Sequence, residues 1–273
     1  AQSFGLIAMA AWISHPVMWV ATFVLMGRAF ALYGILGHEA AHRLLFSKRW
    51  ANDGIGRWGL SYPGFVPFDV YRRSHFAHHR DEMGPEEPDV NLYAHYPITP
   101  DSMVRKLRRD ALGLSGWKNL KGLFRGLQYE RTRGVALRIL GTQAVILAAF
   151  TACSRPELYL FLWLIPWMTG WRVINRLRAI AEHGGMIRSK DRRETTHHVR
   201  QSWLPRFWIV PFNTGWHLAH HVDMGVPFQH LPQLHDELVA SGWVVPDLEY
   251  PNYRTLWKAL SARETPTTVT SGA

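Results

Sequence analysis

The sequence predicts an all-α integral membrane protein in which a helical cytosolic domain caps two transmembrane helical hairpins. Three observations predict this fold class. Four apolar segments form two pairs, and each pair is divided by a short break that contains proline. Nearly all Lys and Arg residues lie outside these pairs. Hydrophobic residues make up 47% of the 273 residues and include 13 tryptophans, a composition that favours a bilayer interface.

The first hairpin is predicted from residues 4–14 and 17–37, with the break at His15–Pro16. Residues 17–37 contain one charge, Arg28, and match the length of about 20 residues that a transmembrane helix needs. Residues 4–14 are too short to span a bilayer alone. Because the chain opens with Ala1 inside apolar sequence, we expect this first helix to be truncated.

The second hairpin is predicted from residues 135–153 and 157–174, with the break at Ser154-Arg155-Pro156. Breaks this short imply that each pair of helices starts and finishes on the same side of the membrane. A soluble all-helical protein with these two segments as core helices is the alternative, but residues 17–37 are hard to place in a soluble core.

The two long segments between and after the hairpins, 38–134 and 175–261, carry almost all of the Lys and Arg. The positive-inside rule therefore places both segments in the cytosol. We expect residues 1–261 to form one domain and residues 262–273 to form a disordered tail.

The formal net charge of +10 permits nucleic acid, an anionic membrane face or an acidic partner. Residues 101–133 alternate Lys and Arg with Leu, Trp and Phe, which suits helices at an anionic headgroup surface. Nucleic acid is a poorer fit because membrane spans flank this segment. The one cysteine, Cys153, excludes an intramolecular disulfide and a Cys-based metal cluster.

The 15 histidines are the main anomaly of the composition, and nine of them lie in four clusters. On an α-helix, residues at i, i+3 and i+4 share one face, so each cluster can present its imidazoles to a common centre. Nine imidazoles suit two metal ions with four or five nitrogen ligands each. The clusters are HEAAH with His38 and His42, HFAHH with His75, His78 and His79, EHGG with His183, and HLAHH with His217, His220 and His221.

HEAAH alone also matches the zinc-protease signature, in which Glu39 would act as the general base. That interpretation, including an intramembrane protease, leaves seven clustered histidines unexplained. A metal-binding membrane protein without enzymatic activity is a third alternative.

The three boxes H-x3-H, H-x2-H-H and H-x2-H-H, set around two pairs of transmembrane helices, resemble the membrane fatty acid desaturase–hydroxylase superfamily. The resemblance runs from about residue 36 to 258 and includes HHVDMGVPFQHLPQLHDEL (220–238) and HHRDEMGPEEPDV (78–90). It implies two iron ions on the cytosolic side that activate O₂ to attack an unactivated C–H bond. It also implies nine iron ligands: His38, His42, His75, His78, His79, His183, His217, His220 and His221.

Further residues are expected to support the ligands. In stearoyl-CoA desaturases an Asn stands four residues before the lone histidine, whereas here that position is Ala179. We expect Asn213 either to play a comparable part or to cap a helix. We expect His235, Asp81 and Asp223 near the metals, the two aspartates as acceptors for imidazole N–H groups. Four other carboxylates follow the second box, and we expect some of them to orient imidazoles by accepting N–H groups and most to be loop charge: Glu82, Glu86, Glu87 and Asp89.

The resemblance favours desaturation of a fatty acyl chain or lipid. Hydroxylation, ketolation or oxidative decarboxylation of a fatty acid, alkane or carotenoid on the same scaffold is the alternative. The 273 residues contain neither a His-Pro-Gly-Gly haem segment nor an iron–sulfur cysteine motif, so we expect electrons from a separate protein. Ferredoxin, rubredoxin, or cytochrome b5 with its reductase would suit, and the basic cytosolic surface could dock it.

Overall fold

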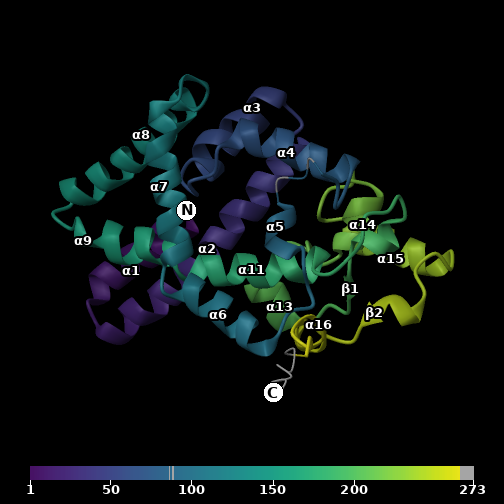
Figure 1. Ribbon diagram of the computed structural model, residues 1–273. Helices are drawn as coiled ribbons and strands as arrows, with labels where there is room; N and C mark the ends of the chain where they lie inside the picture. Colours follow the sequence, from purple (N-terminus) through teal and green to yellow (C-terminus); the bar gives the residue numbers. More distant parts are fainter. Residues whose placement is uncertain (86, 88, 265–273) are drawn as a thin grey trace, which may run out of the picture.

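A computed structural model describes residues 1–85, 87 and 89–264, and this part of the chain is mostly helical, as the sequence predicts (Figure 1). The predicted tail, 262–273, lies outside the described residues from 265 onward. The first half contains α1 (Gln2–Ile13), α2 (Pro16–His42), α3 (Arg49–Gly54), the π-helix η1 (Ile55–Ser61), α4 (Phe68–Arg80), α5 (Val90–Tyr93), α6 (Pro100–Ala111), α7 (Leu114–Arg125) and the 3₁₀ turn η2 (Gly126–Gln128).

The second half begins with the long helix α8 and ends with α16. Its two short strands pair in parallel, with His198 opposite Glu249. The elements are α8 (Glu130–Ala152), α9 (Glu157–Tyr159), the π-helix η3 (Leu160–Leu164), α10 (Ile165–Met168), α11 (Gly170–His183), α12 (Arg192–Thr195), β1 (His198–Val199), α13 (Trp203–Trp208), α14 (His217–Val222), α15 (Leu231–Ala240), the 3₁₀ turn η4 (Pro246–Leu248), β2 (Glu249–Tyr250) and α16 (Tyr253–Leu260).

The apolar segments pack on a common hydrophobic core. Ile7 of α1, Phe30 of α2, Ile146 of α8 and Trp163 of η3 are all buried in it. The first predicted break forms as expected, because Ser14 ends α1 in the left-handed conformation with φ of 52°. Pro16 then begins α2. A proline is tolerated there because an N–H in the first turn of a helix has no partner within the helix.

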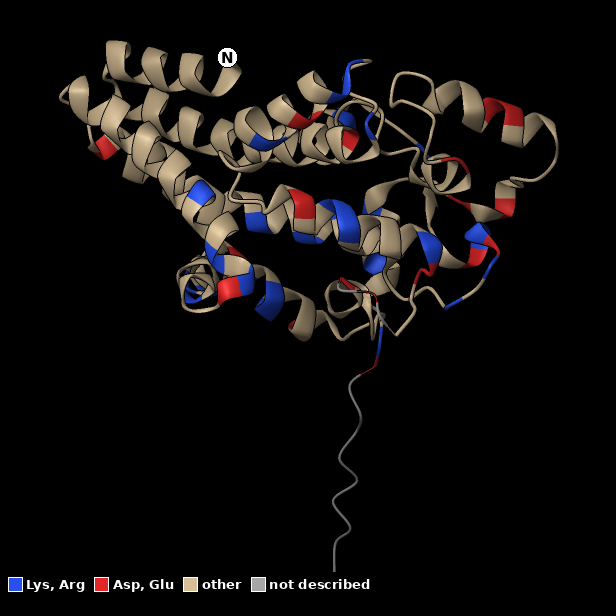
Figure 2. Ribbon diagram, turned by 90° about the horizontal axis from the view of Figure 1, so that it is seen from above, with Lys and Arg blue, Asp and Glu red and all other residues tan. Residues whose placement is uncertain are grey.

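Two of the described helices, α2 and α8, are long and apolar enough to cross a bilayer, judged by length and composition. Helix α1 is apolar but shorter, so the predicted arrangement of four spans stays a prediction. Figure 2 shows few charged residues on α1 and the helices beside it, while Lys, Arg, Asp and Glu gather over the rest of the molecule.

The prediction of one helix over residues 157–174 is wrong. The segment runs through α9, η3 and α10 and then breaks at Thr169, whose φ of −118° and ψ of −85° leave the helical region. Pro166 contributes to the irregularity because it lacks the N–H that would bond to the carbonyl one turn earlier. Gly170 then starts α11 against Gly27 of α2, where a side chain on Gly27 would lie 3.3 Å from the Gly170 backbone.

Helix α11 connects the apolar bundle to the helical domain. Trp171 at its start is buried in the bundle core, whereas Ile180 near its end lies in a second core with Tyr253 and Leu256 of α16. Figure 1 shows α11 crossing the centre of the molecule towards α14. The helix therefore carries its last residue, His183, from the bundle into the domain that holds the other histidine clusters.

Candidate metal centre

The first histidine pair lies in the last two turns of α2, whose end is held by two other elements. Arg72 of α4 donates a hydrogen bond of 2.8 Å to the carbonyl of Ala40, and Asn52 of α3 donates another of 2.8 Å to the same oxygen. Carbonyls at a helix end otherwise lack partners. These bonds fix the turn that carries His38 and His42.

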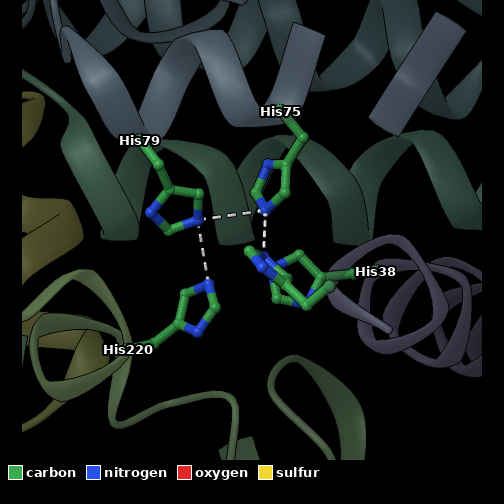
Figure 3. Close-up of side chains that lie close together, drawn as sticks. His38, His75, His79 and His220 are labelled. Carbon is green, nitrogen blue, oxygen red and sulfur yellow. Dashed lines mark hydrogen bonds between the residues drawn. The ribbon is translucent and has the colours of Figure 1, made fainter. Parts of the chain in front are cut away.

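The nine predicted histidines lie together in two adjoining groups. In the first group, one ring nitrogen of each histidine lies within 4.8 Å of those of the others. This group contains His38, His42, His75, His79 and His220. The second group contains His78, His183 and His221, and His217 joins it with its Nε2 at 3.1 Å from that of His183 and 3.0 Å from that of His221. Figure 3 shows part of the first group: His75 and His79 on α4, His220 on α14 and His38 on α2 point towards one another.

The spacing of the nitrogens fits metal ions. Nε2 of His75 lies 2.8 Å from Nε2 of His42 and 3.1 Å from Nε2 of His79. Nε2 of His79 in turn lies 3.1 Å from Nε2 of His220. Two nitrogens bound at right angles to an ion at about 2.1 Å would be about 3.0 Å apart. Both ring nitrogens of His38 are buried without a hydrogen-bond partner among the described residues. The donor set therefore suits two ions that take neutral nitrogen ligands.

Burial keeps these imidazoles in the neutral form that binds metal. Burial is the main cause that lowers the pKa of these histidines well below the usual value near 6.5. The neighbouring imidazoles lower the pKa further. The histidines outside α2 for which this holds are His75, His183, His217, His220 and His221.

Acceptors behind the rings orient three of the histidines. The carboxylate of Glu87 accepts a hydrogen bond from Nδ1 of His78, and that of Glu82 accepts one from Nδ1 of His221. The carbonyl oxygen of Thr195 lies 2.8 Å from Nδ1 of His183. A hydrogen bond at Nδ1 leaves Nε2 as the nitrogen that faces a metal.

The prediction that Asp81 and Asp223 accept hydrogen bonds from imidazole N–H groups is wrong. Arg188 donates two hydrogen bonds of 2.8 Å to the Asp81 carboxylate, and Asp223 accepts one of 2.8 Å from the backbone N–H of Gly225. Both aspartates follow the last residue of a helix and have non-helical backbone angles, so neither side chain continues the helix face that carries the histidines. Glu82, one residue beyond Asp81, is buried and turns inward. Its position three residues after the last histidine of the second box is the only signal that sequence reasoning had for it.

Asn213 and His235 also lie elsewhere. Asn213 has a left-handed φ of 60° in a turn before α14 and accepts a hydrogen bond of 2.9 Å from Arg206, so it neither caps that helix nor shares a face with His217. The ring of His235 packs on that of His198, with 4.6 Å between centroids. Ala179 lines a cavity beside the second group, together with Asn175 one turn earlier.

The zinc-protease alternative requires His38 and His42 to form a site with one further ligand. The structure instead places them in a group of five histidines. Glu39 is buried next to His38, with 3.6 Å between carboxylate oxygen and Nδ1, and lies 3.4 Å from the backbone nitrogen of Phe228. The geometry favours a two-metal centre over a protease site.

Fold and site together define a class of protein: an α-helical protein with bilayer-length helices and two adjoining imidazole groups suited to metal. The family model described as fatty acid desaturase matches residues 13–257. The chain belongs to the fatty acid desaturase family. The predicted superfamily is thereby confirmed, and with it the prediction of an oxidoreductase.

The relatives that this chain matches are named desaturases, and their sequence identity to it is low. Dihydrorhizobitoxine desaturase of Bradyrhizobium elkanii is 25% identical over 212 residues, which cover 71% of this chain and 60% of that protein. An sn-1 oleoyl-lipid 12-desaturase of Arthrospira platensis is 24% identical over 247 residues, 82% of this chain and 68% of the relative. An sn-1 acyl-lipid omega-3 desaturase (ferredoxin) of Nostoc sp. (strain 36) is 32% identical over 89 residues, 32% of this chain and 22% of the relative.

Proposed function

We propose that this protein is a membrane di-iron desaturase that uses O₂ to introduce a double bond into the acyl chain of a lipid or fatty acid. The observation that carries the proposal is the convergence of nine histidines from α2, α4, α11 and α14 into two adjoining groups. The family match over residues 13–257 and the lipid desaturases among the relatives support it.

In this proposal the five histidines of the first group hold one iron, and the four of the second group hold the other. Bound iron would supply the activation of O₂ that removal of hydrogen from an unactivated C–H bond requires. The residues of the chain do the rest: Glu82, Glu87 and the Thr195 carbonyl orient three rings, and the surrounding burial limits the access of water.

The reaction balances with an external donor. Two hydrogens leave adjacent carbons of the substrate and carry two electrons, and a redox protein supplies two more electrons. Two protons from water complete the reduction of one O₂ to two waters. The name of one relative includes ferredoxin, so a ferredoxin is the first candidate donor, with rubredoxin or cytochrome b5 and its reductase as further candidates.

We further propose that the four apolar segments cross the membrane as two hairpins and that the histidines lie at the cytosolic face. The distribution of Lys and Arg supports this orientation. It would place the redox partner in the cytosol and the acyl chain in the bilayer.

Expression in a lipid-producing host, with lipid profiles measured by mass spectrometry, tests the proposal. Loss of two hydrogens from a host lipid supports desaturation, and His221→Ala should abolish it. Gain of one oxygen would indicate hydroxylation instead, and loss of one carbon would indicate decarboxylation. Unchanged lipids together with proteolysis that Glu39→Gln abolishes would favour the protease.

A further inference from the structure

A large apolar cavity lies beside the bundle, away from the histidines. Its volume is about 580 Å³, within the usual range of ligand pockets of about 300–1,000 Å³. Parts of α7, α8, the loop before α4 and the start of α11 form its wall. Apolar side chains such as Phe65, Leu123, Ile139, Trp167 and Trp171 line most of it, and Lys118, Asn119 and Arg172 are among its polar lining residues.

Those three polar residues also line a second, smaller cavity of about 230 Å³. Its charged lining among the described residues is Arg109, Lys118, Arg172, Arg176 and one carboxylate, Asp110. Asp110 is already engaged, because it accepts hydrogen bonds from Arg176 and from Ser115. The smaller cavity therefore carries a surplus of positive charge.

Arg172 is a partly buried member of this set of cations. Its Nε is buried and has no hydrogen-bond partner among the described residues, and its guanidinium lies 4.1 Å from the ring centroid of Trp167. It stands in the first turn of α11, where the positive end of the helix dipole disfavours a cation. Arg172 is only partly buried, but a buried guanidinium N–H without an acceptor is unfavourable, so this position favours an anion.

We propose that these two cavities bind an amphiphile with an anionic head. The head, a carboxylate or a phosphate, lies against Arg172, Lys118 and Asn119, and the apolar chain fills the larger cavity. Guanidinium groups bind carboxylate and phosphate with paired hydrogen bonds, which suits Arg172 for this role.

The site also lies on a route to the histidines. The smaller cavity shares Leu92 and Asn175 with a third cavity of about 230 Å³, which His38, His75 and His183 line. Helix α11 contributes residues to all three cavities. With its chain in the larger cavity, the amphiphile occupies an entry site, and its chain must move along α11 to reach the histidines. The amphiphile bound at Arg172 is then the substrate before turnover, a step that rests on the proposed function, whereas the binding site itself does not.

Binding to the purified protein in nonionic detergent tests the site without turnover. The probes are oleate and oleyl alcohol, which share a chain and differ in head charge, and oleoyl lysophosphatidic acid as the phosphate arm. The wild type should bind at least one anionic probe about tenfold more tightly than the alcohol. The tighter of the two anions identifies the head as carboxylate or phosphate.

Arg172→Gln and Lys118→Gln should each weaken binding of the anionic probe by about tenfold and leave the alcohol unchanged. The matched control is Lys121→Gln, because Lys121 is exposed on α7 but is not part of the lining of either cavity. Leu123→Trp, which fills the apolar cavity, should weaken all three probes. Thermal melting shows which variants fold. If Arg172→Gln does not fold, Lys118→Gln alone tests the site.

Equal binding of anion and alcohol by the wild type would overturn the site, as would an equal effect of Lys121→Gln. The substrate step has its own readout, since Lys118→Gln should raise KM for the desaturated lipid more than it lowers kcat. An unchanged KM together with weakened binding would overturn that step alone. Failure of the proposed function would show as absent turnover with binding intact.

Discussion

The Glu82 carboxylate accepts a hydrogen bond from Nδ1 of His221, although the two residues stand 139 positions apart. Arg192 and Thr195 donate to the same carboxylate, so Glu82 ties α12 and α14 to the end of α4. Both Glu82 and His221 are buried. The bond leaves Nε2 of His221 facing His217 at 3.0 Å. Glu82 thus orients one predicted ligand and joins three elements of the centre.

Glu82→Gln should lower the affinity for iron and the activity by about 10–100-fold, because loss of the group that supports a ligand ring typically has an effect of this size. Iron per purified chain and turnover of lipid measure the effect. Asp81→Asn is the control: this neighbouring carboxylate is bound to the exposed side chain of Arg188, and its loss should leave iron content unchanged. Equal losses in the two variants would show that Glu82 has no special role.

The two groups of histidines should hold separate ions. His220→Ala, in the first group, and His217→Ala, in the second, should each reduce iron from two ions per chain towards one, measured by mass spectrometry of the metal. His235→Ala is the control, because that ring packs on His198 outside both groups. A single zinc ion in the wild type would contradict the binuclear centre.

The spacing i, i+3 and i+4 predicts which histidines of one cluster share a helix face, and the resemblance to the desaturase superfamily implies that the four clusters come together. The sequence does not identify what accepts the Nδ1 hydrogens of these histidines. Asp81 and Glu82 are neighbours of similar chemistry, and only the way the chain leaves α4 decides that Glu82 turns inward. Asn213 fails for the same reason, since its helical face exists only if α14 begins earlier than His217.

Apolar length predicts α2 and α8 well, because hydrophobic composition over about 20 residues is a strong signal. The segment at 157–174 has the same composition but breaks at Thr169. Hydropathy does not report Pro166 or the contact of Gly170 with Gly27, and these local features contribute to the irregularity and to the start of α11.

Close packing of η1 against α2 should be essential near the first histidine pair. A methyl group on Gly56 would lie 2.8 Å from the side chain of Ala40 and 2.8 Å from the ring of Phe68, both of which are buried. Gly56→Ala should therefore destabilise the protein by about 1–3 kcal/mol and reduce iron retention, since Ala40 lies between His38 and His42. Thermal melting and iron content measure these effects.

Gly54→Ala provides the matched comparison for that prediction. Gly54 ends α3 two residues earlier, and a methyl group there meets nothing within 4 Å. Replacement of an unstrained glycine should stabilise the protein by about 0.4–1 kcal/mol or leave it unchanged. If both alanine variants melt at the wild-type temperature, the contact between η1 and α2 is not tight.

The ion pair of Asp53 with Arg72 should make stability depend on pH in the acid range. Arg72 donates a hydrogen bond of 2.6 Å to Asp53 while also binding the Ala40 carbonyl at the end of α2. Hydrogen bonds from Arg72 are the main cause that lowers the pKa of Asp53 from 3.8 to about 2. A carboxyl group with a lowered pKa stabilises the folded state above its unfolded pKa and loses that contribution as pH falls through the folded value.

Asp53→Asn should therefore lower Tm by about 2–4 °C at pH 7, which corresponds to about 1 kcal/mol after allowance for solvent screening. The difference from the wild type should stay constant down to about pH 4 and shrink as pH falls towards about 2. Melting curves of both proteins across this range measure it, with Asp247→Asn as an exposed carboxylate for comparison. The ion pair of the wild type exists only while Asp53 is ionised. A difference in Tm between the two proteins that grows towards pH 2 would therefore mean that the carboxylate does not anchor Arg72.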